Sequence, residues 1–148
     1  MKTKYFLLFI VLLSLSCKAQ TKSAAIDSLI MIDKVYRTNE EVYSVSMIKL
    51  LANPERYNGK RIILHGYLNL EFEGNALYFH KDDYLQNILK NSVWVNLNDK
   101  IAEQAHKYNK AYVTILGTFD NEDTGHMGVF GGGLKNITNI SISRSRDN

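Results

Sequence analysis

Apolar and polar residues alternate between positions 61 and 72, and this run constrains the fold more than any other feature of the chain. A period of two is typical of a β-strand with one buried face. The apolar residues on that face are Ile62, Leu64, Leu68, Leu70 and Phe72. Gly66 interrupts the run, and a glycine inside a strand marks a bulge or a sharp coil. The pattern therefore predicts one long, half-buried strand that bends at Gly66, as strands do at the corner of a barrel.

Four shorter strands are expected after this one. Gly74-Asn75 is a two-residue hairpin signal, and it leads into the second strand. From their alternation and their β-branched or aromatic content, these strands are predicted at residues 76–80, 92–97, 111–119 and 134–142.

Helices are expected between the strands and before them. Apolar residues recur at helical spacing over residues 81–91 and 98–108. Ser46 is placed to cap a helix that begins at Met47, and Pro54 ends that helix because it disfavours helical geometry in the preceding residue. A looser helical stripe begins near Ile26 and extends towards Val35 and Tyr36.

The order of these elements favours one class of fold. Three strands, a helix and two more strands match a small Greek-key barrel of the OB type. We therefore predict a mainly β protein with helices (α+β), in which a five-stranded OB-like barrel over residues 42–143 is preceded by N-terminal helices. A β-sandwich fits less well because the strands are too few. With 148 residues, the chain has room for one such domain.

The N-terminal residues are typical of an export signal. Lys2 and Lys4 precede a short apolar run, and small residues follow it. We predict a signal peptide at residues 1–16 and lipid attachment at Cys17, because the residues before Cys17 resemble the lipobox of bacterial lipoproteins. A lipid-anchored tether with a short helix (17–41) and a polar tail (144–148) would flank the barrel. The predicted location is the cell envelope, as a periplasmic or outer-membrane lipoprotein. Secretion after cleavage at Ala19 is the alternative.

Removal of the signal peptide leaves a nearly neutral chain. Two of the 18 basic residues lie within it, so 16 remain against 15 acidic residues. A surface of this kind lacks the excess of cations that binding to nucleic acid requires, and no nucleic-acid partner is expected. The single cysteine also excludes a disulfide within the chain.

Several short segments resemble a group of small exported bacterial proteins of unknown function with an OB-like body. These segments lie at residues 57–60, 66–68, 71–78, 94–95, 117–119 and 125–128. The most specific are Glu-Phe-Glu-Gly-Asn-Ala-Leu-Tyr at 71–78 and Gly-His-Met-Gly at 125–128. The resemblance implies a fold and an envelope location, and it brings no activity with it.

The loop at residues 120–128 carries the densest group of metal-ligating side chains, namely Asp120, Glu122, Asp123 and His126. Carboxylates with an imidazole are suitable ligands for a divalent cation. The loop begins like an EF-hand, but the twelfth position, which should be a glutamate, is Gly131, and this excludes an EF-hand. A solvated turn that uses acids and glycines for a tight bend is the alternative interpretation.

His65 and His80 would complete a metal site if the fold brought them to His126. His65 lies on the polar face of the first predicted strand, and His80 lies at the end of the second. Each of them alone is more often a hydrogen-bonded structural histidine.

Tyr67 and Trp94 are candidates for a binding surface, together with Tyr78 and Phe79. OB barrels stack bases and sugars on aromatic rings of this kind. Packing of the same rings in the core is the alternative.

The sequence contains no complete catalytic motif, so catalysis is not expected. We expect a barrel that binds a partner protein or a small ligand through the 120–128 loop and the face that bears His65 and Tyr67. The membrane is a second expected partner, through the lipid anchor at Cys17. No cofactor is expected unless the histidines and carboxylates bind a divalent metal. A metal-dependent hydrolase with a His/carboxylate site and a structural accessory of envelope assembly remain as alternatives.

Overall fold

The computed structural model describes residues 34–37 and 40–143, and the structural statements below concern these residues. The predicted signal peptide, the lipidation site at Cys17, the tether up to residue 33 and the 144–148 tail lie outside the described residues. Among the residues described, no helix is long and apolar enough to cross a membrane.

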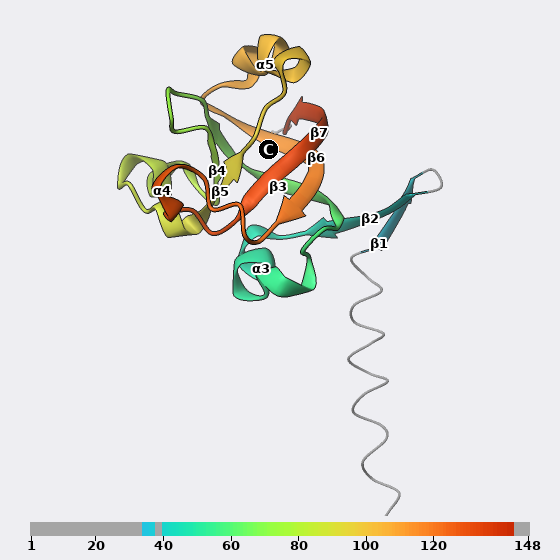
Figure 1. Cartoon of the computed structure of the whole chain (residues 1–148). Helices are drawn as coiled ribbons and strands as arrows, with labels where there is room; N and C mark the ends of the chain where they lie inside the picture. Colours follow the sequence, from blue (N-terminus) through green and yellow to red (C-terminus); the bar gives the residue numbers. More distant parts are fainter. Residues whose placement is uncertain (1–33, 38–39, 144–148) are drawn as a thin grey trace, which may run out of the picture. The chain divides into compact units, whose positions relative to one another are not determined.

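Five strands close into a barrel (Figure 1). They are β3 (Arg61–Asn69), β4 (Ala76–Tyr78), β5 (Ser92–Val95), β6 (Ala111–Asp120) and β7 (Gly133–Ile142). Their order is β3-β4-β5-β7-β6, and β6 pairs back onto β3 to close the ring. Only the β5–β7 contact among these five is parallel. This arrangement confirms the predicted α+β, mainly β class with a five-stranded OB-like Greek-key barrel.

Two more strands extend the sheet before the barrel begins. β1 (Lys34–Arg37) and β2 (Glu40–Val45) form an antiparallel pair, and β2 runs parallel to the first half of β3. The helix expected to extend through Val35 and Tyr36 is therefore wrong for these residues. The physical reason is that β3 offers a free backbone edge at Arg61–Leu64 to β2, and β2 offers its other edge to β1. Strand pairing thus completes the backbone hydrogen bonding that a helix would have made internally.

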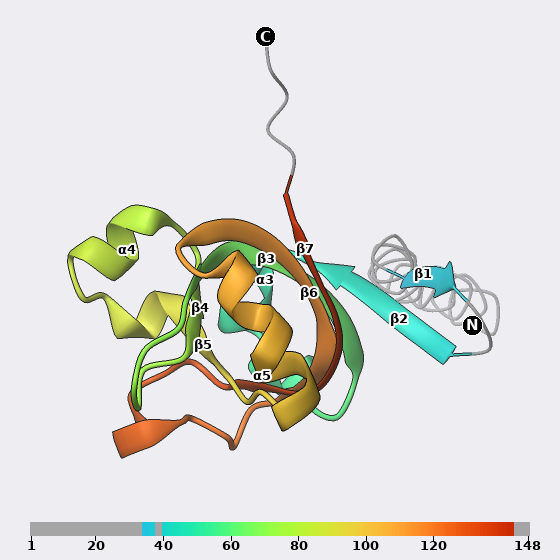
Figure 2. The same ribbon diagram turned by 90° about the horizontal axis from the view of Figure 1, so that it is seen from above.

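Three short α-helices surround the barrel. The first, α3 (Met47–Ala52), begins as predicted at Ser46, whose Oγ accepts a hydrogen bond from the Lys49 amide at 3.3 Å. α4 (Lys81–Leu85) lies in the β4–β5 connection with the 3₁₀ turn η2 (Leu89–Asn91), and α5 (Asp99–Ala105) lies between β5 and β6. Figures 1 and 2 show α5 over one opening of the barrel and α3 at the other. The barrel interior is thus closed at both ends.

Gly66 marks the place where β3 changes its partner. The strand pairs with β2 before this glycine and with β4 after it, while its pairing with β6 continues across it. A Cβ at position 66 would clash with the backbone oxygen of Tyr78 and would lie 2.9 Å from Leu77 Cγ. The glycine therefore permits the close approach of β4. A bulge at Gly66 is not seen, because the pairing of β3 with β6 runs from Arg61 to Leu68 without a shift in register.

The strands β3, β4 and β5 carry a hydrophobic cluster on each face, one inside the barrel and one outside it. The interior core includes Leu68, Leu77 and Val93, all fully buried. Successive side chains point to opposite faces of a strand, so the neighbouring residues Tyr67, Ala76 and Tyr78 lie on the outer face. There they form a second cluster with Phe130, covered by Tyr84, Leu89, Trp94, Tyr112 and Val129.

Candidate functional site

The most exposed large apolar side chains of the described residues stand on two loops that meet. Phe72 in the β3–β4 loop is 92% exposed, and Met127 in the β6–β7 loop is 82% exposed. Their sequence neighbours join the loops, because His126 Nε2 lies 3.7 Å from Glu73 Oε2. We call Phe72, Glu73, His126 and Met127 the loop surface.

The β6–β7 loop is fixed to the barrel by aromatic packing. Gly125 has φ +65° and lies directly against Trp94, so that a Cβ there would come within 2.6 Å of the indole Cδ2. Trp94 in turn packs on the buried ring of Phe130, with 5.3 Å between the ring centroids. The Phe130 amide donates to the Thr124 oxygen at 3.2 Å. His126 and Met127 therefore project from a loop whose two sides are anchored.

The β3–β4 loop is held by side-chain amides at its ends. Asn75 Oδ1 accepts from the Glu71 amide at 3.1 Å inside the loop. Asn109 bridges from the segment before β6, accepting from the Leu70 amide at 2.8 Å and donating to the Leu70 oxygen at 3.1 Å. This loop begins at Leu70, so the prediction of strand through residue 72 was too long, and Phe72 points to solvent instead of the core.

The loop surface also carries strained backbone. Glu73 has φ 55° and Met127 has φ 61°, which is the left-handed conformation that residues other than glycine seldom adopt. Each such residue costs on the order of 1–3 kcal/mol and is found most often where function requires a fixed side chain.

The three carboxylates predicted in the 120–128 loop have different surroundings. Lys135 Nζ donates to Asp120 Oδ2 at 2.6 Å, and this hydrogen bond, followed by one from the Glu122 amide, lowers the pKa of Asp120. Asp123 accepts from the Gly125 amide at 3.4 Å and lies against Gly133, whereas Glu122 is exposed. Asp120 and Asp123 therefore hydrogen-bond within the turn, which is the structural alternative considered from the sequence.

His65 and His80 both contact the ring of Tyr112. The His65 ring stacks on Tyr112 with 6.1 Å between centroids, and its Nδ1 is 2.7 Å from Ser143 Oγ. The His80 ring meets Tyr112 edge-on at 5.7 Å. His126 pairs instead with Glu73, so the structure brings two of the three histidines to one tyrosine and leaves the third elsewhere.

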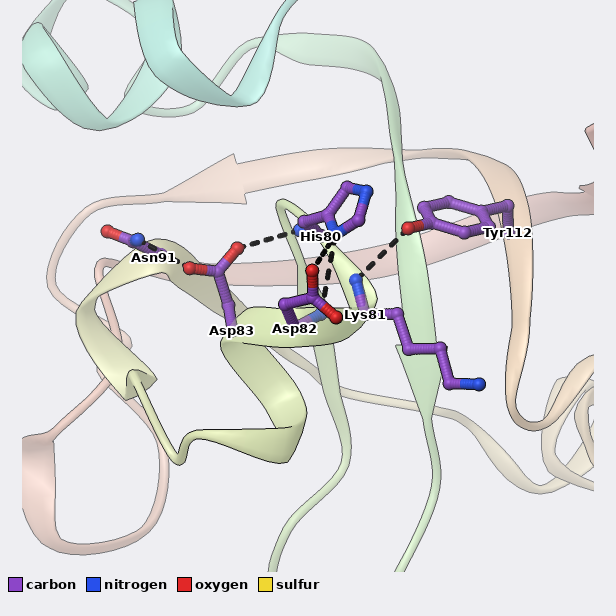
Figure 3. A network of polar contacts seen from close by, with 6 residues as sticks. All are labelled: His80, Lys81, Asp82, Asp83, Asn91 and Tyr112. Atoms are coloured by element: carbon purple, nitrogen blue, oxygen red, sulfur yellow. Dashed lines mark hydrogen bonds and ion pairs between the residues drawn. The ribbon is translucent and has the colours of Figure 1, made fainter.

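His80 also begins α4, in the hydrogen-bond network of Figure 3. Its Nδ1 accepts from the Asp82 amide at 3.3 Å, and its own amide donates to Asp83 Oδ2 at 2.9 Å. The other oxygen of Asp83 accepts from Asn91 Nδ2 at 2.7 Å, and the Lys81 amide donates to the Tyr112 hydroxyl at 3.1 Å. His80 therefore has the structural role of a helix N-cap.

Within residues 34–37 and 40–143, no three His, Cys, Asp or Glu side chains are grouped so that they could hold a metal ion. The predicted ligands are distributed instead over the Asp120–Lys135 pair, the Tyr112 neighbourhood and the loop surface. The geometry thus offers no three-histidine centre.

The aromatic residues proposed from the sequence as a binding surface are mostly covered. Tyr67 is buried between Tyr84 and Tyr112, with centroid distances of 5.8 Å and 5.5 Å. Burial, together with these two neighbouring phenols, raises the pKa of Tyr67. Burial also raises the pKa of Tyr78, with Glu71 and Tyr84 adding to the effect. Trp94 is half-buried on Phe130, so these rings pack against the chain's own residues.

This packing covers the face that OB folds commonly use. In such barrels the second and third strands and the adjoining loops bind ligands, and here those strands are β4 and β5. Tyr84 from α4 and Phe130 from the β6–β7 loop lie over them. The two most exposed large apolar side chains are instead at the loop tips. Sequence reasoning singled out the 120–128 loop but placed Phe72 in a strand, and the Glu-Phe-Glu-Gly setting of Phe72 was the signal for a loop.

The fold and the site thus define a closed OB-like mixed barrel that presents two joined loops with exposed apolar tips. Comparison of the chain with protein-family models, with curated proteins and with solved structures finds no match.

Proposed function

We propose that this chain is an exported, lipid-anchored protein of the cell envelope whose OB-like barrel binds a partner protein through the loop surface. Export and anchoring rest on the signal-like residues 1–16 and on Cys17 in a lipobox-like setting. Binding rests on one observation. Phe72 and Met127, each more than four-fifths exposed, stand on loops that the His126–Glu73 contact joins.

A binding role explains why large apolar side chains are exposed on these loops, where exposure to water is unfavourable. Large apolar side chains with most of their surface in water mark interaction sites when they gather on one face. Both Met and Phe are enriched in the cores of protein interfaces. The anchoring of Gly125 on Trp94 holds the loop before binding, which reduces the entropy lost on association.

The proposal places the contact elsewhere than on the rings first suggested by the sequence. Tyr67 is buried, and its contribution is to support the barrel wall beneath α4. A hydrolase that used His65, His80 and His126 together would need these residues to converge, and the described residues place them around Tyr112 and beside Glu73.

Photo-crosslinking in the full chain tests this proposal. A photoreactive phenylalanine analogue replaces Phe72 in cells, and a matched protein carries it at Leu85, which is 59% exposed on α4 outside the loop surface. We expect a discrete adduct from position 72 and none from position 85. The double variant Phe72→Ser/Met127→Ser should weaken partner binding by about tenfold or more, since exposed interface anchors contribute most of the binding energy. Equal crosslinking from both positions, or none from position 72, would contradict the proposal.

A further inference from the structure

The two methionines in the described part of the chain lie in opposite environments. Met47, the first residue of α3, is 2% exposed and belongs to the interior core. Met127, at the tip of the β6–β7 loop, is 82% exposed. A methionine thioether is converted to a sulfoxide when an oxidant reaches its sulfur. The fold therefore shields one of these two thioethers and leaves the other open to solvent.

The turn at residues 125–128 presents Met127 to solvent. The Gly128 amide donates to the Gly125 oxygen at 3.2 Å and closes the turn. Gly125, Met127 and Gly128 have φ values of 65°, 61° and 69°. This left-handed backbone suits the two glycines and is unfavourable for Met127. A glycine would satisfy the turn better, so any advantage of a methionine at this position comes from its side chain.

The contacts that hold the β6–β7 loop in place are made by other residues. Gly125 packs directly on Trp94, and His126 Nε2 lies 3.7 Å from Glu73 Oε2. With four-fifths of its surface in water, the Met127 side chain contributes little to the packing of the loop. A chemical change confined to its sulfur therefore alters what the loop surface offers to a partner and leaves the loop where it is.

We propose that Met127 is a reversible oxidation site, at which conversion of the thioether to a sulfoxide weakens partner binding by the loop surface. This inference rests on the proposed function, because it concerns the regulation of the same surface. Oxidation turns a flexible apolar side chain into a polar one. A sulfoxide oxygen that is buried in an interface without a hydrogen-bond donor loses its hydration, and this opposes binding.

The oxidant is a hydroperoxide, and hydrogen peroxide is the simplest example. The lone pair on the Met127 sulfur attacks one peroxide oxygen, so that an S–O bond forms and the O–O bond breaks. The proton of the transferred hydroxyl passes to the departing hydroxide, which leaves as water. Sulfur loses two electrons and the peroxide gains them. A methionine sulfoxide reductase reverses the change, because two thiols become one disulfide while the sulfoxide oxygen leaves as water.

Peptide mapping of the purified full-length chain measures where oxidation occurs. Trypsin cleaves after lysine and arginine, so residues 38–49 and 111–135 carry Met47 and Met127 on separate peptides. We expect hydrogen peroxide to oxidise Met127 at least about tenfold faster than Met47, because susceptibility follows exposure. In urea the two rates should become similar, which assigns the difference to the fold. Equal rates in the folded chain would overturn the inference.

The photo-crosslink from position 72 measures the effect on binding. Envelope fractions that contain the photoreactive chain are treated with hydrogen peroxide, cleared of it with catalase and irradiated. The yield of adduct should fall about tenfold, and a methionine sulfoxide reductase with dithiothreitol should restore it. In Met127→Leu, whose side chain peroxide does not oxidise, the ratio of the yields after and before peroxide should stay near one. Met127→Gln places a polar group there and should give a low yield without peroxide.

The crosslink also separates this inference from the proposed function. An adduct whose yield is unchanged when Met127 is oxidised overturns the inference and leaves partner binding intact. The same conclusion follows if peroxide lowers the yield equally in Met127→Leu, or if the reductase fails to restore it. The absence of any adduct before peroxide is added contradicts both the inference and the proposed function.

Discussion

Gly125 determines how the loop surface is oriented, because its backbone and its lack of a side chain are both required. With φ +65° and ψ −162° it adopts a conformation that is essentially limited to glycine, and Trp94 occupies the space of a Cβ. We expect Gly125→Ala to lower the free energy of unfolding by about 1–3 kcal/mol or more. The same variant should weaken the loop-surface contact, because His126 and Met127 follow directly. Urea denaturation and photo-crosslinking from position 72 measure these two effects.

Gly59 provides the matched control for this substitution. It also has a positive φ, +70°, but nothing lies within 4 Å of the position that a Cβ would take. Gly59→Ala should therefore cost only the left-handed backbone, about 1–2 kcal/mol, and leave association unchanged. Equal losses at both positions would show that contact with Trp94 contributes nothing.

The Asp120–Lys135 pair predicts a specific dependence of stability on pH. The hydrogen bond from Lys135 lowers the pKa of Asp120 below its ordinary 3.8 in the folded chain. A carboxyl group of this kind stabilises the fold above its unfolded pKa, and the contribution is lost as the pH falls through the lower folded value. Lys135, whose pKa is raised by the same bond, loses its contribution only as the pH rises above 10.5.

Asp120→Asn should therefore lower the melting temperature near neutral pH, and the difference from the wild type should disappear at the acid end of the titration. Thermal melts of the wild type, Asp120→Asn, Lys135→Gln and the double variant measure it. The double variant should melt close to either single variant at neutral pH, because the first substitution already breaks the pair. Additive losses would mean that the two residues act independently.

Individual residues differ in how much of their role the sequence reveals. Ser46 was predicted as a helix cap because its hydroxyl accepts a hydrogen bond from the amide three residues later, which is a local interaction. The partners of His65, His80 and His126 were not predictable, because Ser143, Tyr112 and Glu73 are brought to them by tertiary packing. Asn69 shows the same limit, since alternation assigns it to the polar face, and yet it is fully buried on the outer face of β3.

At the scale of elements, α4 depends on one buried carboxylate. Asp83 accepts hydrogen bonds from the His80 amide and from Asn91, so it joins the beginning of α4 to the end of the same connection (Figure 3). Asp83→Ala leaves these donors without their acceptor and should lower the free energy of unfolding by about 1–3 kcal/mol. Hydrogen exchange of residues 81–91 should become faster in this variant. Asp82→Ala, at an exposed neighbouring position, should change stability by no more than about 0.5 kcal/mol. A similar loss in both variants would contradict the role assigned to Asp83.

Strands inside the barrel were predictable although their partners are distant in sequence. Their side chains alternate between the core and the outer face, and this alternation is visible in the sequence itself. β6 alternates between buried and partly exposed residues along nearly its whole length, and the prediction for residues 111–119 differs from Ala111–Asp120 by one residue. β1 and β2 were missed for the opposite reason. β2 is specified by a parallel partner 19 residues later, as in the pairing of Val42 with Arg61, a contact that no local pattern records, and β1 forms on the edge of β2.

At the scale of the whole molecule, the order of strands was predictable and the covering of the outer face of β4 and β5 was not. Greek-key connectivity follows from the order of the elements, and the structure has it. The outer face of β4 and β5 is different, because the chain folds its own β4–β5 connection and Phe130 over it. A face that other OB barrels leave open is part of the core here, and exposed apolar surface is left at the loop tips and at α3. Whether this face is open or covered is decided by tertiary packing, which the sequence pattern does not reveal.

The lipid anchor is the last feature to predict at this scale, because it determines whether the chain stays at a membrane. We expect the wild type in the membrane fraction, with its mature N-terminus at a lipid-modified Cys17, and Cys17→Ser in the soluble fraction. Cys17→Ser should also lose most of the crosslinking from position 72 at the same expression level, because release from the membrane lowers the effective concentration of a partner in the envelope. Met127→Ser is the control that keeps the anchor and weakens the contact. N-terminal mass analysis decides the point, because an unmodified mature chain that begins at Gln20 would mean secretion after Ala19.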